Sequence, residues 1–207
     1  MDKLELIVER VLKKIEERKY IPVEASARHV HLSRVHVDQL FGEGYELEMV
    51  RELSQPGQYV CKERVDIIGP KNILKNVAIL GPVRGSTQIE ISRTDSITLG
   101  INAPLRLSGD LADSETLYIR CNGKIIEVPN STIVAKRHIH MTPEDGKRFG
   151  VEDKQIVKVR IKSLRPVIFE DVIVRITDKS RLAMHIDHDE ANACGFVEGV
   201  VGEIIVT

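Results

Sequence analysis

The sequence contains one motif twice, and this repeat constrains the fold more than any other feature. Residues 23–42 (VEASARHVHLSRVHVDQLFG) and 132–150 (TIVAKRHIHMTPEDGKRFG) share Arg-His-x-His, an apolar residue, Ser or Thr, a short polar stretch and Phe-Gly. Ser33 and Thr142 are residue types that begin helices, and Pro143 suits a first helical position. Each copy therefore predicts a strand that carries two histidines, followed at once by a short helix. Two related β domains are the natural inference.

Short β-branched segments separated by Gly, Pro and Asn fill the chain after residue 22. We expect strands at 65–69, 77–81, 87–92, 96–101, 116–121, 124–129, 155–161, 169–176, 181–187 and 202–207. Strands this closely spaced and joined by turns favour barrels or sandwiches over a doubly wound sheet. The Asn-Gly pair at 122–123 predicts a two-residue hairpin turn, because a turn of this kind requires positive φ.

Composition excludes several classes of protein. The 207 residues carry a net charge of −1, which gives no electrostatic reason to expect a nucleic-acid or membrane partner. No apolar segment approaches the roughly 20 residues of a membrane span, and the charged start lacks the apolar centre of a secretory signal. Cys61, Cys121 and Cys194 are far apart and form no CxxC pair, which disfavours a disulfide framework and a cysteine-rich zinc site. We therefore expect a reducing, cytoplasmic location.

Residues 1–20 show the clearest helical pattern in the chain. Apolar residues recur on one stripe, and Glu and Lys fill the opposite face. The stripe consists of Leu4, Ile7, Val8, Val11, Leu12 and Ile15. Such an amphipathic helix can pack on its own domain, pair with a second copy in a homodimer, or bind the surface of a partner.

The two histidine pairs predict metal binding. On a strand His29 and His31 point the same way, with α-carbons about 7 Å apart, and so do His138 and His140. Imidazoles placed in this way can converge on one ion at about 2.0–2.1 Å. One such pair is a weak signal, but two copies, each preceded by Arg and followed by a capped helix, favour a metal centre.

A third histidine cluster lies in RLAMHIDHDEANACGF, residues 181–196. His185 closes an apolar run, where an imidazole without a partner is costly to bury, so it is a better ligand candidate than His188. We expect His188 in solvent or in a turn, and His36 on a helix surface. Four paired histidines with a fifth nearby are more than one structural metal site with tetrahedral geometry normally uses. Two metals, or one metal with substrate-binding neighbours, are both consistent with this number.

Two further segments carry polar residues suited to a site. Arg84 lies in a turn bounded by Gly and Pro, and Glu90 shares a strand face with Gln88. An arginine fork recognises phosphate, and a carboxylate can complete a zinc shell. Arg106 and Ser108 lie in a similar turn-like segment. From spacing alone, each of these residues fits an ordinary surface position better than a functional site.

Five segments in order resemble the PduL-type phosphotransacylases, also called phosphate propanoyltransferases. They are ASARHVHLS, GPVRGSTQIEIS, NAPLRLSGDL, AKRHIHMTPEDG and MHIDHDEANACGF, and the resemblance runs from about Val23 to Thr207. It implies a mainly β fold of two β-barrels with short capping helices. The first barrel would comprise residues 21–27 plus 136–207, the second residues 28–135, and the active site would lie between them.

The resemblance also implies a reaction and its residues. Acyl-CoA plus phosphate would interconvert with acyl phosphate plus CoA at two zinc ions per chain, and cobalt would suit the same donors. His29 and His31 would hold one ion. The other ion would be held by Glu90, His138, His140 and His185. Arg84 would be catalytic and bind phosphate, with Ser108 beside it. At position 188 the sequence has a histidine where the resemblance leads us to expect a smaller polar residue. This difference affects none of the implied metal ligands.

Several alternatives stay open at this stage. Direct transfer of a propanoyl or acetyl group competes with an acyl-enzyme on Cys121 or Cys194, although neither cysteine lies in a nucleophile motif. A metal-dependent hydrolase or a zinc-stabilised, non-catalytic β module is the alternative function. The resemblance also implies that residues 1–20 can act as an encapsulation peptide that binds a bacterial microcompartment shell protein. Fusing them to a fluorescent protein in a shell-forming host distinguishes this role from packing.

Overall fold

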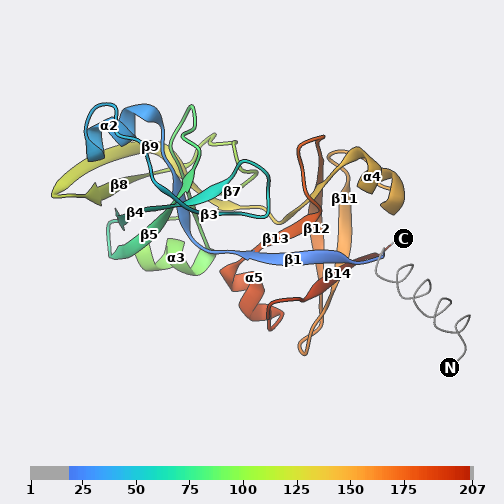
Figure 1. Ribbon diagram of the computed structural model, residues 1–207. Helices are drawn as coiled ribbons and strands as arrows, with labels where there is room; N and C mark the ends of the chain where they lie inside the picture. The colour runs from blue at the N-terminus through green and yellow to red at the C-terminus, as the bar shows by residue number, and fades with distance from the viewer. Residues whose placement is uncertain (1–18, 206–207) are drawn as a thin grey trace, which may run out of the picture. The chain divides into compact units, whose positions relative to one another are not determined.

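The computed structural model describes residues 19–205 and shows a mainly β protein with short helices (Figure 1). Contacts divide the chain into two compact units. The first barrel contains the described residues up to Ala25, Arg137–Ile186 and those from Glu190 onward. The second barrel contains Ser26–Lys136 and the short segment Asp187–Asp189. This last segment differs from the predicted division, which placed all of 136–207 in the first barrel.

The first barrel is a closed ring of six strands. Their order around the ring is β1 (Ile21–Ser26), β13 (Ala183–Asp187), β10 (His138–Met141), β12 (Val167–Ile176), β11 (Ile156–Lys162) and β14 (Val201–Ile205). Strict alternation of buried and exposed residues along β11 sends Val157, Val159 and Ile161 into the core. Helix α4 (Pro143–Phe149) belongs to this unit, and α5 (His188–Ala193) does so from Glu190 onward.

The second barrel also closes, because β8 pairs with both β4 and β9. The ring runs β4 (Tyr59–Ile68), β5 (Ile73–Gly81), β2 (His29–His31), β6 (Gln88–Ile91), β9 (Lys124–Ala135) and β8 (Glu115–Cys121). Strand β3 (Met49–Glu52) is added to β4, and β7 (Leu105–Arg106) to β9. Helices α2 (Arg34–Phe41) and α3 (Arg93–Leu99) complete the unit. Its core consists mainly of Val, Ile and Leu.

The predicted strand–helix repeat is confirmed. Strand β2 leads into α2, whose N-cap Ser33 accepts a hydrogen bond from the backbone N–H of His36. Strand β10 leads into α4, where Thr142 accepts from the N–H of Asp145 at 3.1 Å and Pro143 takes the first turn. The hairpin turn is confirmed as well, since Asn122 and its glycine neighbour have φ of 50° and 75°.

The strand predicted at 96–101 is wrong, because this segment belongs to helix α3. Ser92 and Asp95 form a capping box, in which each side chain accepts from the other residue's backbone N–H. Gly100 ends the helix in the left-handed conformation. The β-branched residues Ile97 and Thr98 indicate a strand, whereas the capping box before them favours the helix. The other nine predicted strands lie on strands of the structure, as far as their residues fall within 19–205.

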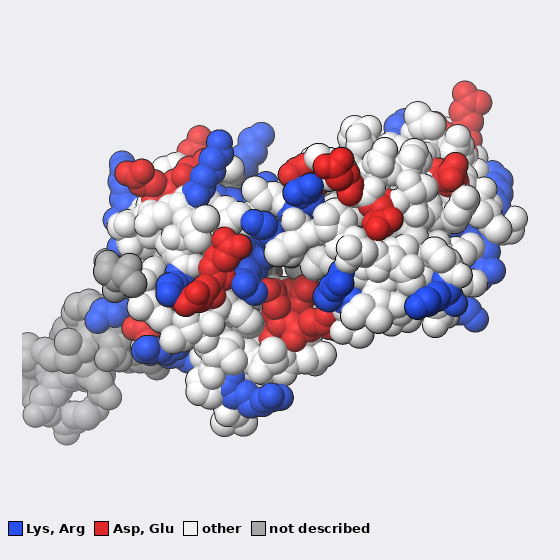
Figure 2. Space-filling view, turned by 180° about the vertical axis from the view of Figure 1, so that it is seen from behind, with Lys and Arg blue, Asp and Glu red and all other residues white. Residues whose placement is uncertain are grey.

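The helix predicted at residues 1–20 lies almost wholly outside the described residues. Within residues 19–205, no helix is long and apolar enough to cross a membrane. On the face shown in Figure 2, acidic and basic side chains are interspersed among uncharged ones.

Candidate metal centres and active site

The second barrel brings His29, His31 and Glu90 together. The two histidines project from the same face of β2, and Glu90 lies on β6, in register opposite His29. One potential ligand atom from each residue lies within 4.8 Å of the others. All three side chains are buried, with 7%, 2% and 9% of the residue surface exposed respectively. Three buried donors that converge in this way fit a cation of the zinc type.

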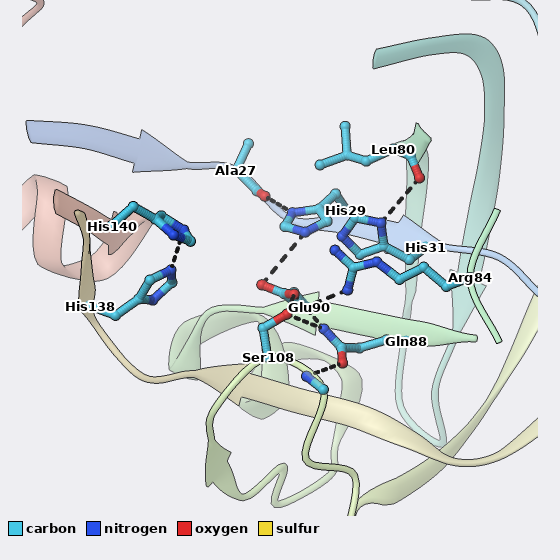
Figure 3. A network of polar contacts seen from close by, with 11 residues as sticks. Ala27, His29, His31, Leu80, Arg84, Gln88, Glu90, Ser108, His138 and His140 are labelled. Carbon is cyan, nitrogen blue, oxygen red and sulfur yellow. Dashed lines mark hydrogen bonds and ion pairs between the residues drawn. The ribbon is translucent and has the colours of Figure 1, made fainter. Parts of the chain in front are cut away.

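Hydrogen bonds fix both imidazole rings of this group (Figure 3). His29 donates from Nδ1 to the carbonyl oxygen of Ala27 at 2.8 Å, and His31 donates from Nδ1 to that of Leu80 at 3.1 Å. Since a carbonyl only accepts, each ring carries a proton on Nδ1, and in the neutral form of the ring the lone pair is on Nε2. His29 Nε2 lies 3.5 Å from Glu90 Oε2. Hydrogen bonds from Nδ1 to a backbone carbonyl, as in both of these rings, orient histidine ligands in metal sites.

The first barrel brings His138, His140 and His185 together in the same way. His138 Nε2 lies 3.0 Å from His140 Nε2, close to the roughly 3.3 Å that separates two nitrogens bound to one tetrahedral ion. His185 Nε2 is buried and makes no hydrogen bond among the residues described. Glu24 Oε2 lies 3.2 Å away from it. Nitrogens that face one another and a buried imidazole nitrogen without a hydrogen bond fit a cation at this position.

The structure corrects the predicted division of the ligands, because Glu90 lies with the first histidine pair and not with the second. The reason is strand register. Strand β6 runs antiparallel to β2 and sets Glu90 opposite His29, while β13 runs antiparallel to β10 and sets His185 opposite His138. On their other side, β2 and β10 each pair with a parallel strand. Each barrel thus supplies its own third donor from an equivalent position.

Arg84 and Ser108 lie beside the group of the second barrel (Figure 3). The backbone N–H of Arg84 donates to the carbonyl of Leu32 at 2.9 Å, which holds this loop against β2. Arg84 Nη1 lies 3.5 Å from Ser108 Oγ, and Ser108 donates to Glu90 Oε1 at 2.9 Å. A half-buried guanidinium and a hydroxyl therefore lie beside the carboxylate, and both groups can donate hydrogen bonds to a phosphate.

Sequence reasoning missed Gln88 as a site residue. Its side chain is only 2% exposed, and Nε2 donates to Glu90 Oε1 and, at 2.9 Å, to Ser108 Oγ. Its Oε1 accepts from the backbone N–H of Gly109 at 2.8 Å. A signal was present, because the period of two places Gln88 and Glu90 on one strand face.

Electrostatics keep a histidine of each group neutral. Burial, with help from the charges of His29 and Arg84, lowers the pKa of His31 to about 3. Burial and the neighbouring histidines lower the pKa of His140 to about 3. Burial also acts to lower the pKa of His29, but the Glu90 carboxylate outweighs it and raises this pKa. Burial opposes the charge of Glu90, yet His29 lowers the carboxyl pKa overall. Neutral imidazoles are the form that binds a metal.

The remaining histidines lie outside both groups. His36 lies in α2, half-buried, with Nδ1 2.7 Å from Thr87 Oγ1, so its predicted surface position is only partly right. His188 is exposed at the start of α5, as expected. Arg106 donates from Nε to the carbonyl of Ala112 at 3.1 Å.

The cysteines are poorly suited to nucleophilic attack. Cys61 and Cys194 are buried and Cys121 is half-buried. Burial raises the pKa of the Cys61 thiol to about 11 and raises the pKa of Cys121 and of Cys194 as well. Because the thiolate is the nucleophile, these environments disfavour an acyl-enzyme.

We expect the metal-free protein to lose stability as the pH falls from 7 to 4. His31 and His140 bind a proton near pH 6.5 when unfolded but only near pH 3 when folded. The unfolded state therefore binds more protons between these values, which costs up to about 1.4 kcal/mol per pH unit for each histidine. The raised pKa of His29 adds stability only while the pH falls to the unfolded value near 6.5, so below that pH this residue no longer opposes the loss.

Thermal denaturation of chelator-treated protein across this pH range measures the effect. His140→Gln, which does not titrate, should flatten the slope. A melting temperature that rises on acidification would contradict the prediction.

Known proteins share this sequence along almost its whole length. The profile of the phosphate propanoyltransferase family matches residues 22–197. A phosphate propanoyltransferase of Clostridioides difficile (strain 630) is 53% identical over 199 residues, which cover 96% of this chain and 95% of the relative. That of Listeria monocytogenes is 52% identical, covering 96% and 93%. That of Thermotoga maritima is 52% identical over 174 residues, covering 84% and 83%. With its ordered motifs and its fold, the chain belongs to the phosphate propanoyltransferase family.

Proposed function

We propose that this acyltransferase interconverts short-chain acyl-CoA plus phosphate with acyl phosphate plus CoA, with propanoyl and acetyl groups as the candidate acyl groups. The observation that carries the proposal is the pair of three-donor groups, one of which has Arg84 and Ser108 beside it. Relatives that are 53% and 52% identical bear the name phosphate propanoyltransferase. A site of this chemistry suits two anionic substrates, a phosphate and a thiolate.

Two zinc ions per chain fit the donors. His29, His31 and Glu90 would hold one ion, and His138, His140 and His185 the other. Three protein ligands leave a fourth tetrahedral position open, as in catalytic rather than structural zinc sites. When bound, zinc lowers the pKa of a thiol and acts as a Lewis acid on an oxygen. Cobalt accepts the same nitrogen and oxygen donors.

Arg84 is the residue that would bind the phosphate. Its planar guanidinium matches two phosphate oxygens, and Ser108 Oγ, 3.5 Å from it, offers a further hydrogen bond. In the proposed direct transfer, a phosphate oxygen attacks the thioester carbonyl carbon, a C–O bond forms, and the C–S bond breaks to release the CoA thiolate. Both donor groups serve one reaction in this scheme. The placement of the active site between the barrels stays a prediction.

Direct transfer requires no covalent enzyme intermediate, in agreement with the raised thiol pKa values. An acyl-enzyme would instead exchange labelled phosphate into acyl phosphate without CoA. Such exchange would contradict direct transfer and leave the overall reaction in place.

The proposed activity is tested by mixing propanoyl phosphate with CoA and the full chain. We expect propanoyl-CoA to form in equal amount to the phosphate released, and chelation to stop the reaction. Consumption of propanoyl phosphate without CoA would identify a metal-dependent hydrolase. No turnover with the metal-loaded protein would favour a non-catalytic β module.

The remaining predictions concern partners and location. Binding of residues 1–20 to a microcompartment shell protein, a homodimer, and a cytoplasmic location inside or outside such a compartment stay proposals. The amphipathic pattern of residues 1–20 supports the first two.

A further inference from the structure

We propose that Gln88 is a positioning residue that determines which oxygen of Glu90 faces the metal. The inference rests on the proposed metal site of the second barrel, but not on the identity of the acyl group. It concerns the metal affinity of His29, His31 and Glu90 as a group.

Three hydrogen bonds fix the amide of Gln88. The backbone N–H of Gly109 donates to Oε1, so the amide cannot flip without losing this bond. Nε2 then faces Glu90 Oε1 and Ser108 Oγ. With Gln88 only 2% exposed, water does not readily replace these partners.

Glu90 has two oxygens in different environments. Oε1 accepts hydrogen bonds from Gln88 and from Ser108, whereas Oε2 lies 3.5 Å from His29 Nε2. The two donors occupy Oε1 and direct Oε2 to the ligand position. We infer that Glu90 binds through Oε2 alone, because Oε1 is taken by hydrogen bonds.

The other barrel provides an internal comparison. On the strand that supplies the third donor, Gln88 lies opposite His31, and the equivalent position opposite His140 is Ala183. The third donor there is His185, which has no second carboxylate oxygen to satisfy. The amide is therefore present at the site with a carboxylate and absent at the site without one.

This comparison yields a double-mutant cycle. In the natural background, Gln88→Ala should weaken metal binding at the second-barrel site about 10–100-fold, as loss of an outer hydrogen-bond partner does. In a Glu90→His background the same change should cost less than about threefold, because the group that Gln88 positions has been removed. Zn²⁺ affinity is measured on the full chain by competition with a chromophoric chelator, and the site of His138, His140 and His185 is the internal control.

Gln88→Met separates positioning from packing. This variant fills the space of the side chain without a donor, so its Zn²⁺ affinity should fall as in Gln88→Ala.

The outcomes are distinct. Unchanged Zn²⁺ affinity in Gln88→Ala, an equal loss at both sites, or an equal loss in the Glu90→His background overturns the inference. So does a wild-type chain that binds no ion at the second-barrel site. Failure of the proposed function appears separately, as absence of CoA-dependent turnover in a chain whose Zn²⁺ affinities follow the cycle.

Discussion

Replacing His140 with alanine is expected to remove one metal ion per chain and to lower the rate of acyl transfer at least about 1,000-fold. His140 Nε2 lies 3.0 Å from His138 Nε2, so the substitution deletes one of three donors at its site. Loss of an ion that stabilises transition-state charge by several kcal/mol corresponds to a rate loss of about this size.

Elemental analysis and the CoA-dependent assay measure the two effects together. The site of His29, His31 and Glu90 lies in the other unit and should keep its ion. His188→Ala is the matched control, since this exposed histidine is only three residues from His185 and outside both groups. Two ions per chain in His140→Ala would contradict the assignment of this site.

Replacing Arg84 with alanine is expected to lower kcat/KM for phosphate by about 100- to 1,000-fold, the cost of removing a preorganised charge from a reacting oxyanion. The Arg84 backbone is held to Leu32, and its guanidinium reaches towards Ser108 next to Glu90. Arg84→Lys keeps the charge but not the two-pronged geometry, so it should recover only part of the loss.

Steady-state kinetics with phosphate and acyl-CoA varied separately show where the loss lies. We expect a larger change in KM for phosphate than in KM for acyl-CoA, with both ions retained. Arg106→Ala is the control, because its guanidinium donates to Ala112 and lies near Asp110 and Asp113. An Arg84→Ala enzyme with normal KM and kcat would exclude Arg84 from phosphate binding.

Interactions between residues that are neighbours in the sequence explain why much of the fold could be predicted. The caps Ser33 and Thr142 and the Asn122 turn depend on neighbouring residues alone, and all are confirmed. The segment 96–101 shows the limit of such predictions, because its β-branched residues and the Ser92 capping box indicate opposite structures. Tertiary packing favours the helix, which buries Leu99.

The ligand set shows the same limit at the level of the site. Residue type and strand period identify the histidines and Glu90 as donors. They do not indicate which of these donors combine at one site. Gln88 was seen only as a neighbour of Glu90 on one strand face, since an amide has no distinctive chemistry until its partners are known.

The sequence by itself determined the duplicated strand–helix unit, the β-rich class and the donors available, because period, caps and residue chemistry are local properties. Only the tertiary structure decided that Glu90 joins His29 and His31, and that Gln88 and Ser108 bind its second oxygen. The physical reason is strand register. Backbone hydrogen bonds between segments about 60 residues apart set Glu90 opposite His29, and no local pattern in either segment specifies that pairing.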